Sequence, residues 1–317
     1  IFGMKAYNDM PFTPLKHTIA KYRWLYQLGL QGPDMFFYNI PILRHRDYRN
    51  VGSYMHEHKV NAFFECCLRR IGTIRSRQQQ EEAISYLAGF MNHYIADSIC
   101  HPYVYGRIGY PVDAPTSMHH GMHAHLENEL DAILLWKYKK KKPSEFNQTA
   151  TICLNGQEIQ FISHFLASCI NETYYPITYR NNFQVTPAMV HRSIWALRFG
   201  CRTLSDKNGK KKFGIAQVES IFVNHPVASA KMVTDSVTDY RSSCNLNHEA
   251  WGNPWDPTRV STASFVDLFH ETLDKCSRVY ALLNSAVTDN MPLDKQDLSP
   301  LLAELGNESY HSGLPVE

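Results

Sequence analysis

The sequence has no long apolar run. Its longest apolar stretches are short, such as residues 132–136, whereas a helix that crosses a bilayer needs about 20 consecutive apolar residues. A large excess of one charge is also missing, because 32 Lys and Arg residues and 30 Asp and Glu residues leave a net charge of +2. We therefore expect no transmembrane segment, and the charge gives no signal for a nucleic-acid partner.

Several metal and redox motifs are missing too. The eight cysteines form no CxxC pair and fall mostly in apolar helical patterns, which favours buried free thiols in a reducing compartment. "HEHKV" is not the HExxH zinc motif, because position 60 is Val, and there is no His-Asp doublet. No signal peptide is visible, so we expect a cytoplasmic protein. Secretion stays open, because a chain that opens with Ile1 does not reveal its true start.

The sequence does contain helical periodicity along most of its length. We predict an all-α fold, a single-domain multi-helix bundle over residues 1–317, with 1–9 either disordered or an extension upstream of "MPFTPLKH". One β-hairpin is expected within 151–161 around Asn155-Gly156, and 205–214 is predicted to be a polar loop. The expected helices span residues 13–28, 51–70, 78–100, 119–142, 161–172, 187–204, 216–222 and 261–286.

One predicted helix carries metal-ligand types at four-residue spacing. In "NHYIADSICHP", His93, Asp97 and His101 follow one another at this interval, and residue i+4 of a helix lies nearly above residue i. The residue before a proline resists α geometry, so Pro102 predicts that the helix stops at His101. His101 would then turn towards a different ion from His93.

A second predicted helix repeats the pattern. In "HHGMHAHLENELD", His123, Glu127 and Asp131 recur at four-residue spacing. Either helix alone is also typical of a polar surface stripe. Two such faces packed together would converge on a site for two or more metal ions, with imidazoles and carboxylates as ligands.

Asp34 and His56 are two further candidates. Asp34 lies in "GPD", where Pro33 fixes the backbone just before it. A carboxylate held in such a turn could bind a metal or act as a general base, and the alternative is an N-cap for a helix that begins at Met35. His56 lies in "GSYMHEHKV", and its neighbour His58 faces elsewhere on a helix.

Taken in order, these motifs resemble the zinc-dependent phospholipase C family. The series is His17, a Gly-Pro-Asp turn, Met-His-Glu, His-x-x-x-Asp-x-x-x-His-Pro and His-x-x-x-Glu-x-x-x-Asp, with a looser match over 251–269. The chain looks closest to the bacterial branch that lacks the toxin's lipid-binding domain.

The resemblance implies two or three Zn²⁺ ions and hydrolysis of a phosphate ester by metal-activated water, with a phospholipid as the suggested substrate. Asp34 is the expected general base. Asp131 is expected to orient a ligand histidine or to cap the packing. His119 and His120 are expected to face solvent, with support of the ligands as the alternative, and His119 or His120 is also the alternative to His101 as a ligand. The implied ligand sets are Asp34, His56, His93 and Asp97 for one zinc, His101, His123 and Glu127 for a second, and His17 with Asp97 for a third.

Two other functions stay open on the sequence. Zinc-dependent single-strand nucleases and nucleotidases use a similar helical metal site, and stacking aromatics with a basic groove would favour them. A metal-stabilised binding protein without turnover is the second alternative, and a fully coordinated zinc would favour it. The lysine run 137–142 is predicted to be a solvated helix end, with peripheral contact to an anionic membrane as the alternative.

Overall fold

The computed structural model describes residues 1–38, 51–174, 184–204, 206, 210–222, 229, 232, 233, 235, 237 and 239–317. These residues form two compact units. The larger unit comprises Phe2–Ser98, Ala150–Phe199 and Thr272–Glu317, and the smaller comprises Ile99–Thr149 and Gly200–Glu271 together with Ile1.

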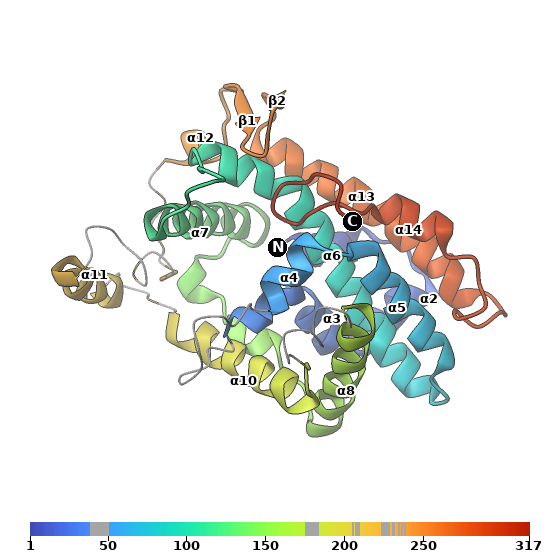
Figure 1. Cartoon of the computed structure of the whole chain (residues 1–317). Helices are drawn as coiled ribbons and strands as arrows, with labels where there is room; N and C mark the ends of the chain where they lie inside the picture. The colour runs from blue at the N-terminus through green and yellow to red at the C-terminus, as the bar shows by residue number, and fades with distance from the viewer. Residues whose placement is uncertain are drawn as a thin grey trace. The chain divides into compact units, whose positions relative to one another are not determined.

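The all-α prediction is confirmed, because the described residues are mostly helical (Figure 1). None of the helices among them combines the length and apolar content needed to cross a membrane. The elements of the larger unit are α1 (Phe2–Asp9), α2 (Pro14–Lys21), α3 (Arg23–Gly29), η1 (Gly32–Tyr38), α4 (Val51–Glu57), α5 (Val60–Thr73), α8 (Gly156–Thr173) and α14 (Ser299–Leu305). Those of the smaller unit are α7 (Ser117–Lys139), η2 (Pro143–Glu145), α11 (Lys210–Phe222), α12 (Tyr240–Ser243), β1 (Trp251–Asn253) and β2 (Asp256–Ser261). Residues of both units occur in α6 (Arg77–Arg107), η3 (Gln148–Thr151), α10 (Pro187–Leu204) and α13 (Phe265–Thr288).

Apolar stripes at helical spacing build the core of the larger unit. Helices α5 and α8 lie side by side (Figure 1), and each buries one face. Phe64 and Leu68 are fully buried on α5, and Ile162 and Leu166 on α8. All eight cysteines are free thiols, as expected. Burial raises the pKa of the Cys67 thiol, so this side chain acts as a small apolar residue.

Two glycines let α3 cross α6 at backbone contact. A Cβ at Gly29 would lie 2.0 Å from the carbonyl oxygen of Tyr86, and one at Gly89 would lie 2.1 Å from that of Tyr26. No other residue type fits at either position without moving a backbone. This crossing places the start of η1, which follows α3 directly, beside the middle of α6.

Several predicted boundaries are wrong. The predicted helix 13–28 is interrupted at Tyr22, and the predicted helix 51–70 is interrupted at Lys59, whose φ of 51° is left-handed. The hairpin expected around Asn155-Gly156 is the start of α8: the Asn155 side chain accepts a hydrogen bond from Glu158 N, and the Glu158 carboxylate accepts one from Asn155 N. This is a capping box, which uses the same residue types as a turn.

The β-hairpin lies elsewhere, in the segment of the looser family match. Strands β1 and β2 pair antiparallel, with Trp251 opposite Ser261 and Gly252 opposite Val260. Residues 2–9 form α1 and are not disordered. Of the polar loop predicted over 205–214, residue 205 and residues 207–209 lie outside the described part, and α11 already begins at Lys210.

The expected stop at Pro102 is also wrong, because α6 continues through this residue to Arg107. Proline removes one backbone hydrogen bond and strains the preceding turn. Tertiary packing offsets that cost, because Tyr103 and Val104 are buried and the Tyr103 hydroxyl donates to Ser243 O at 2.6 Å. His101 therefore lies inside the helix. The lysine run does end α7, with Lys140 in the left-handed conformation after Lys139.

Candidate metal centre

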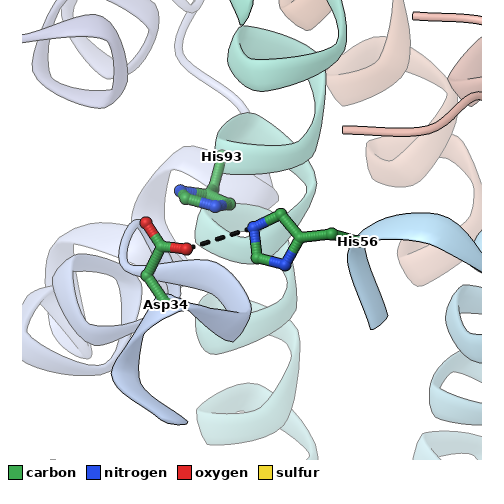
Figure 2. Close-up of side chains that lie close together, drawn as sticks. All are labelled: Asp34, His56 and His93. Carbon is green, nitrogen blue, oxygen red and sulfur yellow. Dashed lines mark ion pairs between the residues drawn. The ribbon is translucent and has the colours of Figure 1, made fainter. Parts of the chain in front are cut away.

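The first cluster of possible ligands combines three residues from three elements. Asp34 lies in η1, His56 in α4 and His93 in α6, and their side chains point towards one another (Figure 2). His56 Nε2 lies 3.1 Å from Asp34 Oδ1. One donor atom of each residue lies within 4.8 Å of the other two. Two imidazoles and a carboxylate therefore surround a common point.

The ring of His56 is oriented by its own helix. Its Nδ1 lies 2.7 Å from Gly52 O, and since a carbonyl oxygen can only accept, Nδ1 carries a proton. In the neutral ring, Nε2 then presents its lone pair to Asp34. A lone pair and a carboxylate oxygen at 3.1 Å repel each other unless a cation lies between them. That cation is either a second proton or a metal ion, so the contact suits a metal site.

Gly32 is required for the approach of η1 to His93. Its φ is +49°, and a Cβ there would lie 2.0 Å from His93 Cδ2 and 2.5 Å from His93 Nε2. The backbone of η1 therefore touches the imidazole directly. Asp34 N donates to Gln31 O at 3.1 Å inside this tight turn, which directs the carboxylate at His56. Asp34 lies within a 3₁₀ helix and is not an N-cap of a helix starting at Met35.

Asp97 lies one turn after His93 and contacts it. Asp97 Oδ2 is 3.1 Å from His93 Nε2, and both side chains are largely buried. The spacing in α6 thus brings this pair together beside the first cluster. His17 is different, because it is exposed on α2 and belongs to neither group of clustered donors. The structure does not assemble the expected third site of His17 with Asp97.

The second cluster joins α6 to α7 within the smaller unit. His101 Nε2 and His123 Nε2 each lie 3.0 Å from the same atom, Glu127 Oε1. The two histidine side chains are 12% and 16% exposed, whereas Glu127 is 41% exposed. The partial burial of Glu127 by itself would raise the pKa of its carboxyl, but the neighbouring His123 and His101 outweigh this effect and hold the pKa well below its usual range. The carboxylate is therefore charged and able to bind a cation.

Aromatic rings line one side of the second cluster. The Tyr105 ring lies 4.5 Å from that of His123, and Trp255 meets Tyr105 edge-on at 4.9 Å. Tyr110 stacks on Trp255 at 5.7 Å. Trp255 lies at the turn between β1 and β2. No functional residue was predicted in this segment from the sequence. We call Tyr105, Tyr110 and Trp255 the aromatic wall.

The three candidates for residues that support the ligands lie outside both clusters. His119 Nδ1 accepts a hydrogen bond from Thr116 N at 3.2 Å and so caps α7. His120 lies near the Tyr110 ring, and Asp131 is exposed one turn after Glu127. It is His101, and neither His119 nor His120, that meets His123 and Glu127.

Two residues beside the first cluster were not predicted from the sequence. His311 stacks on His56 with ring centroids 4.8 Å apart and an angle of 11°, and Tyr310 packs against the same ring at 4.8 Å. Tyr310 N also donates to His56 O at 2.9 Å. Burial raises the pKa of Tyr310 well above its ordinary value, so it stays neutral. No motif or spacing connects positions 310 and 311 to His56, so only the folded chain shows this contact.

A loop over residues 307–316 holds both of these residues in place. Two hydrogen bonds link the ends of the loop. Val316 N donates to Asn307 O at 2.9 Å, and Asn307 Nδ2 donates to Val316 O at 2.7 Å. Within the loop, Gly313 N donates to Ser309 O at 2.9 Å. His56 is thus clamped on two sides, from its own helix and from this loop.

The donor sets fit zinc. Each cluster supplies two histidines and one carboxylate, and three protein ligands with an open position are typical of catalytic zinc. In a tetrahedral site with bonds of about 2.0–2.1 Å, neighbouring ligand atoms lie roughly 3.3 Å apart. The three carboxylate–histidine separations of 3.0–3.1 Å would widen only slightly around an ion, and every other pair of donor atoms in a cluster lies within 4.8 Å.

The site and the fold together define a helical protein built around clustered His and carboxylate ligands. Residues 1–178 match the family described as zinc dependent phospholipase C. This match covers more than half of the chain, so the chain belongs to that family of zinc-dependent phospholipase C hydrolases. No curated protein and no solved structure matches it. All six clustered donors lie inside the matched region, whereas Tyr310 and His311 lie beyond it.

Proposed function

We propose that this chain is a zinc-dependent phosphodiesterase with a phospholipid as its substrate. The observation that carries the proposal is the pair of clusters, each with two imidazoles and one carboxylate around a common point. Three protein donors leave one position of a tetrahedral zinc ion for a non-protein ligand, which is typical of a catalytic centre and not of a structural one. Family membership supplies the substrate class.

Zinc, when bound, supplies positive charge that stabilises phosphate oxygens in the transition state and makes water a better nucleophile at neutral pH. The residues of the chain position the ligands and accept the proton. His56, oriented by Gly52 O, and His93, in contact with Gly32, hold fixed positions in the first cluster. Asp34 engages His56 through Oδ1 and is 44% exposed. Its Oδ2 is therefore the atom we propose as acceptor of the proton that attacking water loses.

The aromatic wall favours one second candidate. Bases of a single-stranded nucleic acid stack on aromatic side chains, and Tyr110 and Trp255 pack on Tyr105, which contacts His123 of the second cluster. A zinc-dependent nuclease would use the same ligands on a different diester. The net charge of +2 provides no strong attraction for a polyanion, so we place phospholipid first.

Metal analysis and a substrate panel test the proposal. Protein purified without chelator is analysed for zinc and assayed on phosphatidylcholine in mixed micelles, single-stranded DNA and a phosphomonoester. We expect zinc in the protein, cleavage of the phospholipid to a diacylglycerol, loss of activity with chelator and recovery on adding zinc. Preferential cleavage of DNA would establish the nuclease, and bound zinc without turnover on any ester would indicate a binding protein.

A matched pair of variants ties activity to the second cluster. His123→Asn removes a clustered ligand, whereas His125→Asn makes the same change two residues later at a half-exposed position outside the cluster. We expect the first variant to lose zinc and activity and the second to keep both. Equal behaviour of the two would mean that the cluster is not the centre of the chemistry.

A further inference from the structure

Helix α10 presents an unusual exposed surface. Trp195 and Phe199, one turn apart, are 64% and 57% exposed, and their rings stack at 5.7 Å with an angle of 6°. The opposite face is an ordinary core stripe, with Val190, Ile194 and Leu197 buried. Single exposed apolar residues are common on proteins. Two large aromatic rings stacked side by side in water are a contiguous apolar patch, which marks an interaction site.

The charge of α10 indicates which kind of partner it binds. The helix sequence, PAMVHRSIWALRFGCRTL, contains Arg192, Arg198 and Arg202 and no Asp or Glu. Among the described residues, none of these arginines forms a salt bridge. Arg192 is exposed and Arg198 partly so, beside the aromatic pair. The patch is therefore apolar at its centre and cationic around it.

We propose that the Trp195–Phe199 face of α10 docks on an anionic phospholipid bilayer. A helix with basic residues beside Trp and Phe, lying in the plane of the interface, is the arrangement that binds such surfaces. The indole favours the headgroup region, and arginine stems can lie along the lipid while the guanidinium groups meet phosphates. A protein partner would need a complementary acidic and apolar groove, whereas a membrane offers both features everywhere.

This surface is a property of this chain beyond the family region. Helix α10 lies outside residues 1–178, which carry the family match. The inference therefore does not depend on the ligands of the metal centre. It is compatible with a phospholipid substrate, because it would keep the protein at the surface where that substrate lies.

Vesicle binding tests the inference without requiring hydrolysis. We compare co-sedimentation with phosphatidylcholine vesicles that contain or lack phosphatidylserine, using wild type, Trp195→Ser/Phe199→Ser and Arg192→Gln/Arg198→Gln. We expect wild type to prefer the anionic vesicles and each double variant to bind at least about tenfold more weakly. The arginine-dependent part should fade at high salt, because charge attraction at a surface is screened.

Phe12→Ser is the control, since Phe12 is 100% exposed and lies outside α10, between α1 and α2. It should leave vesicle binding unchanged. Equal loss in this control, no binding by wild type, or self-association that the aromatic variant abolishes would each overturn the inference. Cleavage of a soluble short-chain ester should be unchanged in Trp195→Ser/Phe199→Ser. Vesicle binding without any ester hydrolysis would refute the proposed function and leave the docking surface standing.

Discussion

Replacing Gly32 with Ala should remove zinc from the first cluster. The new methyl group would stand 2.0 Å from His93 Cδ2, whereas carbon atoms pack at about 3.5 Å or more. The imidazole or the η1 backbone must therefore move by roughly 1.5 Å. Metal–ligand distances tolerate about 0.2 Å, so the displaced ring can no longer share an ion with Asp34 and His56.

The same substitution has a second, separable cost. Gly32 has a φ of +49°, and a residue with a Cβ in the left-handed region costs roughly 1–2 kcal/mol. That cost alone would lower the free energy of unfolding without touching the metal. Gly109 provides the matched control, because its φ is +61° and nothing lies within 4 Å of a Cβ built there. Gly109→Ala carries the backbone penalty and no clash.

Elemental analysis and urea unfolding separate the two effects. We expect Gly32→Ala to hold one zinc ion fewer per chain than wild type, and Gly109→Ala to hold the full number. Both should unfold at lower urea, and Gly32→Ala should lose the additional stability that bound metal gives. A full zinc content in Gly32→Ala would refute the close approach of η1 to His93. A zinc loss in Gly109→Ala would show that backbone strain, and not the clash, expels the ion.

Three further outcomes are expected. Asp34→Asn should cut turnover by roughly a hundredfold or more and lower the zinc content of the first cluster, because it removes the carboxylate donor of that cluster; near-normal turnover would remove Asp34 from the chemistry. His311→Ala should weaken zinc affinity on the order of tenfold in competition with a chromogenic chelator, whereas His311→Phe, which keeps a ring on His56, should retain it; equal affinities would mean that the stack is irrelevant. Dialysis from pH 7 to about pH 5 should release zinc, because imidazoles with an ordinary pKa of about 6.5 take up protons, and retention of all metal at the lower pH would contradict a histidine-based centre.

Local geometry explains which part of the site the sequence could predict. Four-residue spacing puts His93 beside Asp97 and His123 beside Glu127 in any α-helix, and both contacts occur. The same rule could not tell which helices meet. That His101 shares Glu127 Oε1 with His123 depends on the packing of α6 against α7.

The wrong predictions concern positions where tertiary contacts determine the local structure, or where the same residue types suit two different structures. Pro102 disfavours a helix locally, yet the buried turn that follows it keeps α6 intact. Asn155-Gly156 suits a hairpin, but Glu158 three residues after Asn155 completes a capping box, a signal that was present in the sequence. His311 could not be found at all, because its partner His56 lies far away in the chain.

The crossing of α3 and α6 at two glycines determines which substitutions the first cluster tolerates. Only backbone atoms meet at Gly29 and Gly89, so side-chain size does not set the spacing there. Substitutions elsewhere in the core can be accommodated by repacking, and the distance between η1 and α6 need not change with them. The geometry of the first cluster therefore tolerates substitutions at most of the surrounding positions. That tolerance ends at the two glycines, where any added carbon shifts α3 as a whole and carries Asp34 away from the histidines.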